Sequence, residues 1–228
     1  MEKIIMSDTQ QQIDSLSGGS SSVVMGSNVL SFLSGVSRQD QQFIKDSMRL
    51  AEYRADNLFN RKLEPARWFE FYSGVLWSVG WGLEHAPVII ADNDFSGAVL
   101  DVWAKSMSTL LSREKIKQMK ETFQLLEYDV AGVEVFTDST RKWGDFRFAP
   151  AQYNVHKELE LVISNVRLIN NEWVSTYLFW NITHGSAQLD IQSRRFVTKR
   201  REMDKYRDLL AAAVREFRVK EIELSLKS

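Results

Sequence analysis

The sequence contains no cysteine among its 228 residues, and only 3 prolines and 3 histidines. Without cysteine the chain has no disulfide, no thiolate nucleophile, no cysteine-ligated zinc site and no S-acylation. Hydrophobic residues make up 44% and charged residues 26%, which is typical of an ordinary folded globular protein. The fold must therefore be stabilised without covalent cross-links between cysteines.

The chain also lacks an excess of charge of either sign. Lys and Arg number 29, Asp and Glu number 30, and the formal net charge is −1. A near-neutral protein has no long-range field that attracts polyanions, so nucleic acid is not expected as a partner. Any anion must bind at a local cluster of basic residues.

No hydrophobic run is long enough to cross a membrane. In the most apolar stretch, ARWFEFYSGVLWSVGWGLE at 66–84, only 13 residues separate the charges of Glu70 and Glu84, whereas a helical span needs roughly 20. The N-terminal MEKIIMSDTQQQ has an apolar run of three residues, too short for a signal peptide. We therefore expect synthesis in the cytoplasm without Sec-type export, with release by a non-Sec route left open.

Serine and glycine dominate the beginning of the chain. SLSGGSSSVVMGS and NVLSFLSGVS, within residues 7–37, disfavour a stable helix. We predict a flexible Ser/Gly-rich arm over 1–36, in which the apolar cluster at 29–33 packs on the body as a short turn. A single α+β domain is predicted over 37–228.

Helical spacing of apolar residues predicts a mainly helical first half. Ser37 followed by Asp40 resembles a helix start with a capping box, and further helices are predicted over 65–84, over DNDFSGAVLDVWAKSMSTLLS (92–112) and over 112–128. The 65–84 helix is predicted to be a central helix sandwiched in the core. Because glycine costs a helix roughly 1 kcal/mol relative to alanine, Gly74, Gly80 and Gly82 indicate close approach of another backbone or ring.

After Asp129 the pattern changes to strands. VAGVEVFT (130–137), DFRFAP (145–150), KELELVISNVRLI (157–169) and EWVSTYLFWNI (172–182) are rich in β-branched and aromatic residues. Short connections, with Asn170-Asn171 as a hairpin turn, predict an antiparallel meander. A long helix over 199–218 then crosses the sheet and delivers a final strand near 222–226, which completes a mixed α+β fold.

No catalytic, metal or cofactor motif is found in the sequence. There is no G-x-S-x-G elbow and no phosphate loop. The nearest approach to a metal-ligand set has no i, i+4 pair and consists of His85, Asp92, Asp94 and Asp101, of which Asp92 and Asp94 are interpreted as loop residues that cap the following helix. A second set of carboxylates is interpreted as a solvated strand face: Glu134, Asp138, Asp145, Glu158 and Glu160. We therefore predict no catalytic residue, cofactor or metal, and keep a hydrolase with an unrecognised site as an alternative.

Five cations lie within eight residues where the last strand of the meander meets the C-terminal helix: Arg194, Arg195, Lys199, Arg200 and Arg201. Such a cluster can hold the phosphates of anionic lipid. Acidic residues follow at once, from Glu202, so a solvated, partly ion-paired face is the alternative interpretation. We take these five residues as the candidate contacts with anionic lipid.

The string WFEFYSGVLWSVGW at 68–81 resembles a W-x-x-F-Y-x-x-V-L-x-x-V-G-W pattern found in uncharacterised bacterial and fungal proteins akin to the Evf virulence factor family. The matching residues are Trp68, Phe71, Tyr72, Val75, Leu76, Val79, Gly80 and Trp81. The resemblance implies an intermixed α/β fold, a role in bacterial persistence in an insect gut and no known reaction, with these residues as buried determinants of the fold. Membrane association of Evf is linked to an acylated cysteine, which this chain lacks, so any membrane affinity here must be non-covalent.

Together these features predict a non-enzymatic virulence or toxin-like protein that acts at host membranes. The apolar 66–84 stretch, the Ser/Gly-rich arm and the basic cluster motivate this hypothesis. The alternative is a soluble protein that binds an apolar small molecule or fatty acid between the tryptophan-rich helices and the sheet. The oligomeric state is left open.

Overall fold

The computed structural model describes residues 20–169, 181–217 and 220–224, apart from the side chains of 142–143 and 181–186. Its elements alternate between helices and strands, and the α+β class predicted from the sequence is confirmed. In chain order they are β1 (Ser21–Met25), β2 (Asn28–Phe32), α2 (Arg38–Leu58), α3 (Pro65–Ser78), β3 (Gly82–Ala98), α4 (Val99–Ser106), η1 (Met107–Thr109), α5 (Arg113–Tyr128), α6 (Val130–Trp143), β4 (Asp145–Tyr153), β5 (Leu159–Ile169), β6 (Asn181–Thr198), α7 (Arg200–Ala213), η2 (Arg215–Phe217) and β7 (Glu221–Leu224).

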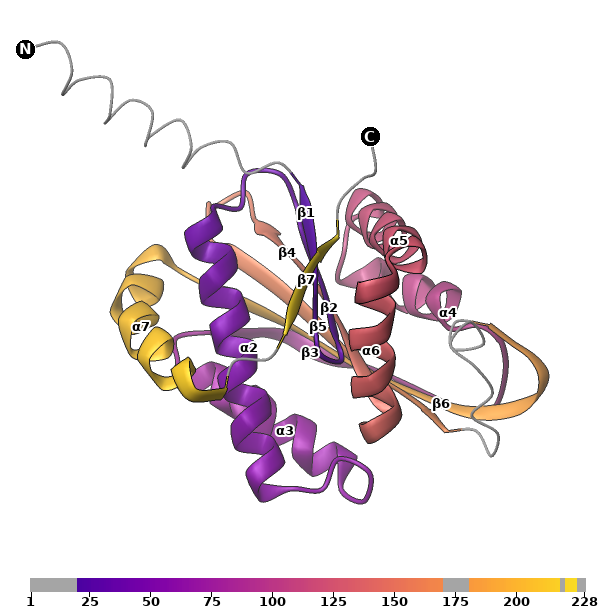
Figure 1. Ribbon diagram of the computed structural model, residues 1–228. Coiled ribbons are helices and arrows are strands. Elements are labelled where there is room, and N and C mark those ends of the chain that lie inside the picture. Colours follow the sequence, from indigo (N-terminus) through magenta and orange to yellow (C-terminus); the bar gives the residue numbers. More distant parts are fainter. Residues whose placement is uncertain (1–19, 170–180, 218–219, 225–228) are drawn as a thin grey trace, which may run out of the picture.

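The strands form a mixed sheet in the order β3-β6-β5-β4-β2-β1-β7 (Figure 1). β4, β5 and β6 are antiparallel neighbours, so the predicted meander is confirmed. β2 lies parallel to β4 and antiparallel to β1. Helix α7 carries the chain from β6 to β7 at the opposite edge of the sheet, which confirms the predicted closing helix and strand.

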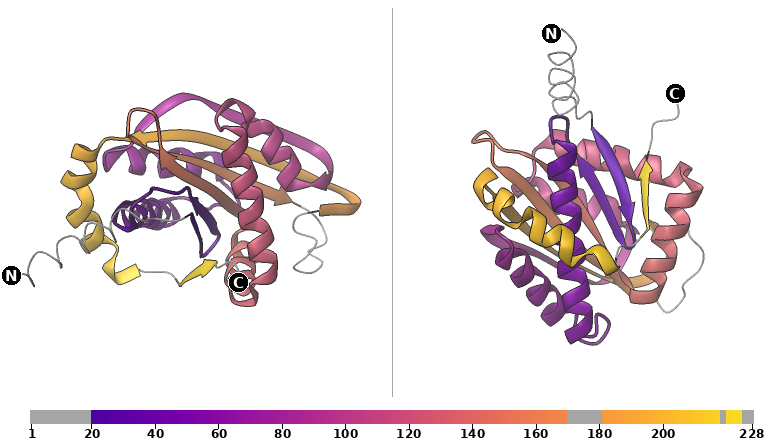
Figure 2. Two further views of the ribbon diagram at one scale, coloured as in Figure 1. Left: turned by 90° about the horizontal axis from the view of Figure 1, so that it is seen from above. Right: turned by 60° about the vertical axis from the view of Figure 1, so that its left-hand side comes forward.

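Helices cover both faces of this sheet (Figures 1 and 2). α2, α3 and α7 pack on one face, and α4, α5 and α6 on the other. On β5, Leu161 and Ile163 face the α2 layer, whereas Val162 and Val166 face the α5 layer. Because successive side chains of a strand point to opposite faces, a strand buried on both sides has a nearly continuous apolar sequence.

Helix starts predicted from capping residues occur where expected. The Ser37 side chain accepts a hydrogen bond from the backbone N of Asp40 at 3.2 Å, and α2 follows. The Ser112 side chain caps α5 in the same way through the backbone N of Lys115. Each cap satisfies a backbone N–H that has no partner inside the helix.

The structure places residues 21–32 inside the sheet, although the sequence predicted a flexible arm there. β1 and β2 form a tight hairpin in which Gly26 has a φ of +57°. Two of their serines are buried but satisfied, because the Thr122 hydroxyl of α5 lies 2.8 Å from Ser22 Oγ and 3.1 Å from Ser31 Oγ. The rest of the predicted arm, residues 1–19, lies outside the described residues.

The apolar 66–84 stretch is divided between a helix and a strand. α3 ends at Ser78, and residues from Gly82 onward form β3, which continues to Ala98 where the sequence predicted a helix. α3 is also not sandwiched, because its outer side is exposed at Glu70, Gly74 and Trp77. The helix ends before β3 because Gly80 forms a left-handed turn and because β3 pairs with β6. The helical spacing of apolar residues reveals neither feature.

Residues 130–137, predicted as a strand, form the first part of helix α6. The Asp129 side chain accepts a hydrogen bond from the backbone N of Gly132 at 2.8 Å and caps this helix. Gly132, Phe136 and Thr140 are buried at steps of four, which is helical spacing. The Asn170-Asn171 turn and residues 172–180 of the next predicted strand lie outside the described residues. Within the described part of the chain, no helix is both long and apolar enough to cross a membrane.

Candidate functional site

The Evf-like residues occupy the inner side of α3 and the turn that follows it. Six of the eight are buried: Trp68, Tyr72, Val75, Leu76, Val79 and Trp81. Phe71 is partly buried and packs against Phe59, with the ring centroids 5.6 Å apart. The pattern thus describes how α3 attaches to its neighbours.

The turn from α3 to β3 is fixed by Gly80 and Trp81. Gly80 has a φ of +95°, and a Cβ placed there would lie 2.9 Å from Cδ2 of Tyr206 on α7. Trp81 Nε1 donates a hydrogen bond to Ser47 Oγ at 3.1 Å, which ties the turn to α2. The close approach predicted for the glycines therefore occurs at Gly80, whereas nothing lies within 4 Å of a Cβ at Gly74.

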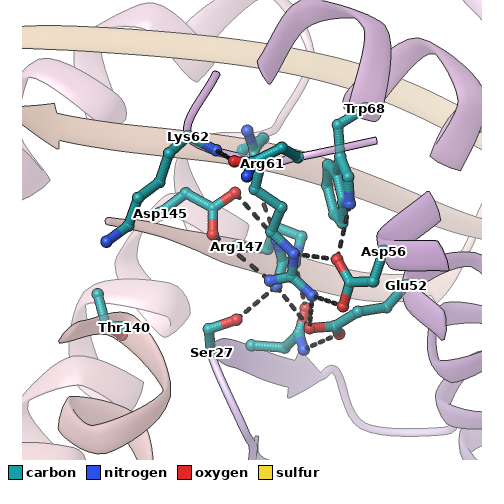
Figure 3. Close-up of polar contacts among 12 residues, drawn as sticks. Ser27, Glu52, Asp56, Arg61, Lys62, Trp68, Thr140, Asp145 and Arg147 are labelled. Carbon is teal, nitrogen blue, oxygen red and sulfur yellow. Dashed lines mark hydrogen bonds and ion pairs between the residues drawn. The ribbon is translucent and has the colours of Figure 1, made fainter. Parts of the chain in front are cut away.

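A buried charge network lies where the C-terminal half of α2 meets the start of α3 and the first residues of β4 (Figure 3). We use this name for Glu52 and Asp56 of α2, Arg61 of the α2–α3 connection, and Asp145 and Arg147 of β4. Both arginines are buried, at 1% and 0% relative exposure. The network joins residues that lie far apart in the sequence.

Glu52 bridges the two guanidinium groups of this network. Its Oε1 lies 2.6 Å from Arg61 Nη2 and 3.1 Å from Arg147 Nη2. Asp56 forms an ion pair with Arg61 and accepts a hydrogen bond from Trp68 Nε1 at 2.8 Å. The Trp68 ring also lies against both arginines, with Cζ atoms 4.6 and 5.0 Å from its centroid. Trp68 therefore packs directly on the buried charge network.

Burial and the neighbouring charges shift the pKa values of Glu52 and Asp145 in opposite directions. Burial alone raises the pKa of Glu52, but the charges of Arg147 and Arg61 outweigh it and lower that pKa to about 2. For Asp145 burial prevails over the same two arginines, so its pKa is raised. Asp145 lies 3.5 Å from each guanidinium, farther than Glu52 does.

This network was not predicted from the sequence, and two of the candidate carboxylates were predicted in the wrong environment. Asp145 and Glu160 were predicted on a solvated strand face, but both are buried. Glu160 pairs with Lys115 at 2.5 Å and with Arg195 at 2.8 Å. Of the same set, Glu134 and Asp138 lie exposed on helix α6. One signal was present: an arginine between two buried phenylalanines of β4 requires a buried partner.

The predicted basic cluster is divided by the alternation of β6. Arg194 faces the α2 layer, where it pairs with Glu70 and lies over the Phe69 ring. Arg195 faces the other layer and pairs with Glu160. Both arginines are thus held in ion pairs on opposite faces of the sheet and do not share one surface.

The other three cations lie at the start of α7, beside the β4–β5 turn. Lys199 Nζ is 3.7 Å from Glu158 Oε1, which brings the two segments together. Arg200 pairs with the buried Asp40 at 3.1 Å. Arg201 is exposed. These cations lie at the positive end of the α7 dipole, which adds to their attraction for anions.

The β4–β5 turn adds an apolar tip to this basic region. Asn154 Oδ1 accepts hydrogen bonds from the backbone N of His156 at 2.9 Å and of Glu158 at 3.0 Å. That turn leaves Val155 93% exposed and Lys157 in a left-handed conformation, with a φ of +61°. We call the exposed set Val155, Lys157, Lys199, Arg200 and Arg201 the basic end.

The residues considered as metal ligands do not converge in the structure. Asp92 Oδ1 accepts a hydrogen bond from the backbone N of Asp94, and Asp101 pairs with Lys120 at 2.8 Å. His85 is exposed on β3. Among the residues that the structure describes, no group of three or more histidine or acidic side chains is arranged to hold a metal ion.

No protein-family model and no curated protein matches this chain. Two solved structures are similar at 8% sequence identity. One is a delta-endotoxin, with a TM-score of 0.40 over 75% of this chain and 79% of that chain. The other is the Evf virulence factor, with a TM-score of 0.35 over 94% of this chain and 91% of that chain. These comparisons do not show a sequence family for the chain.

Proposed function

We propose that this protein is a non-enzymatic, toxin-like virulence protein that acts at host membranes, and that the basic end is its contact with anionic lipid. The observation that carries the proposal is the meeting of an exposed valine with exposed cations on two adjacent segments. Val155 is suited to enter the boundary between headgroups and acyl chains, while Lys157, Lys199 and Arg201 face lipid phosphates.

The expected affinity is modest. Each Lys or Arg near an anionic surface contributes about 1 kcal/mol, and partial burial of one valine adds about 1 kcal/mol. Lys157, Arg201 and Val155 therefore give about 3 kcal/mol, a dissociation constant of several millimolar. Lys199 and Arg200 add less, because each pairs with an acidic residue, Glu158 and Asp40 respectively. Binding should accordingly be reversible and should weaken as salt is added.

The non-enzymatic part of the proposal is supported by the state of the candidate carboxylates. Asp145 and Glu160 are buried in the interior. Glu158 interacts with Lys199 and accepts a hydrogen bond from Asn154. A general acid or base must reach its substrate, which Asp145 and Glu160 cannot do.

Co-flotation of the full chain with neutral and with phosphatidylserine-containing vesicles tests the proposal, with dye release as the readout of toxin-like action. Lys199→Glu is expected to reduce flotation with anionic vesicles. Lys117→Glu on α5 is the matched control, because Lys117 is equally exposed (78% against 75%) and also pairs with a glutamate. Val155→Ser should weaken binding without changing its salt dependence.

Equal flotation with neutral and anionic vesicles, or equal loss in the two lysine variants, would contradict the assignment of the basic end. Failure of the wild-type chain to bind or permeabilise either vesicle would contradict membrane action. A co-purified apolar ligand in native mass spectrometry would then favour the soluble binding protein instead.

A further inference from the structure

The buried charge network fastens a helical hairpin to the sheet. The α2–α3 hairpin comprises α2, α3 and the connection 59–64, and it contributes Glu52, Asp56 and Arg61. β4 contributes Asp145 and Arg147 (Figure 3). The N-terminal half of α2 is held separately, because Asp40 pairs with Arg207 of α7 and Arg49 with Glu221 of β7. Loosening of the network would therefore affect the C-terminal half of α2 and the start of α3.

The charges of this network balance without Asp145. Two guanidinium groups are matched by Glu52, which contacts both of them, and by Asp56, which pairs with Arg61. Asp145 is a third carboxyl, 1% exposed, whose Oδ1 lies 3.5 Å from Arg61 Nη1, at the limit of hydrogen-bond distance. An ionised Asp145 would leave one uncompensated negative charge in the interior, where such charges are costly.

We propose that Asp145 is protonated in the resting protein and that the buried charge network is a proton-controlled clamp, which releases the α2–α3 hairpin from the sheet when Asp145 loses its proton. The clamp concerns a different part of the molecule from the basic end. It does not depend on the proposed function.

The groups around Asp145 set the direction of this control. Its pKa is raised by burial, against the charges of Arg147 and Arg61 and with the help of Glu52. A carboxyl whose pKa is raised on folding stabilises the fold while it is protonated, and that stability is lost as pH rises through the folded-state pKa. The clamp should therefore open toward alkaline pH.

The other titratable or charged groups near the clamp do not supply this dependence. Tyr72 of α3 keeps its proton, because burial raises its pKa. Arg167 of β5 is the cross-strand partner of Asp145 and pairs with Asp190 at 3.6 Å. Lys62 is exposed beside Arg61. The neutral partners in the β1–β2 hairpin are Ser27 and Asn28, which accept hydrogen bonds from Arg147, and Asn28 also donates one to Glu52, at any pH.

Hydrogen exchange of the full chain, read by mass spectrometry from mildly acidic to mildly alkaline pH, tests the clamp without membranes. After correction for intrinsic exchange, amides over 50–70 should open about tenfold more per pH unit between the ordinary carboxyl pKa of about 3.9 and the raised pKa of folded Asp145, because one proton is released on opening in that range, and the increase should stop above it. Amides of α5 provide the internal reference, since α5 packs on the opposite face of the sheet.

Three variants make the test specific. Asp145→Asn mimics the protonated side chain and should abolish the pH dependence of the hairpin. Asp138→Asn, on the exposed side of α6, should behave as wild type. Glu52→Gln should also abolish the pH dependence of the hairpin, because the ionised Asp145 then balances the charge of the second guanidinium group.

Hairpin protection that is independent of pH in the wild-type chain would overturn the proposal. So would wild-type pH dependence in either Asp145→Asn or Glu52→Gln. If Asp145→Asn does not fold, the comparison of wild type with Glu52→Gln decides between the outcomes.

Discussion

Replacement of Gly74 or of Gly80 by alanine should change the free energy of unfolding in opposite directions. Gly80 lies in the turn after α3 with a φ of +95°, whereas Gly74 lies within α3 at an exposed position. In a left-handed conformation a side chain costs about 1–2 kcal/mol. Gly80→Ala therefore loses this amount of stability, whereas Gly74→Ala does not, because Gly74 is not in a left-handed conformation.

Packing adds to the difference between the two sites. The new Cβ at position 80 would meet Tyr206 Cδ2 at 2.9 Å and Glu202 Cβ at 3.2 Å, and forcing extra volume into such a contact costs about 1–3 kcal/mol. We therefore expect Gly80→Ala to lower the free energy of unfolding by about 2–5 kcal/mol. Gly74→Ala should raise it by about 0.5–1 kcal/mol, because nothing lies near its Cβ and alanine favours the helix.

Urea denaturation followed by tryptophan fluorescence measures both changes. Adding Tyr206→Ala to Gly80→Ala, with Tyr206→Ala alone as its control, should recover the part of the loss caused by the Tyr206 ring and leave the backbone part and the contact with Glu202 Cβ. Equal effects at the two glycines, or a neutral Gly80→Ala, would refute the argument that the turn requires glycine.

Two further substitutions test the polar contacts of α2. Asp40→Asn should cost about 2 kcal/mol at neutral pH through weaker bonds to Arg200 and Arg207. Because the wild-type pKa is lowered below 3.8, that contribution is present above 3.8 and lost as pH falls, so the variant should show a flatter acid limb in thermal melts. Trp81→Phe should cost about 1–3 kcal/mol in urea, whereas Trp77→Phe, at a residue 72% exposed, should stay within about 0.5 kcal/mol of wild type.

Local patterns in the sequence were sufficient where the structure depends on residues that are close together in the chain. α2 and α5 begin after serines whose side chains accept backbone hydrogen bonds, and both were predicted from those serines. On β5, Leu159 and Leu161 alternate with Glu160 and Val162 as the period of a strand requires. These features depend on near neighbours only.

The predictions failed where distant contacts decide. Residues 130–137 are rich in valine, yet they are helical: Phe136 packs on Phe146 of β4, a distant contact, and Asp129 provides a local cap that was overlooked. The Ser-rich β1 and β2 are strands because they complete the sheet between β4 and β7. The buried charge network was not predictable for the same reason: no local pattern links Glu52 with Arg147, and the partners meet only in the folded chain.

Pairing of β1 with β7 has a consequence for the order in which the protein can fold during synthesis. Met25 faces Glu221 across this ladder, so β1 gains its partner on this side only after β7 has been synthesised. Before that, the β1–β2 hairpin can pair with β4 alone, and contacts of such long sequence separation form slowly. The edge of β1 should therefore stay open to proteases and to pairing with other chains until β7 has emerged.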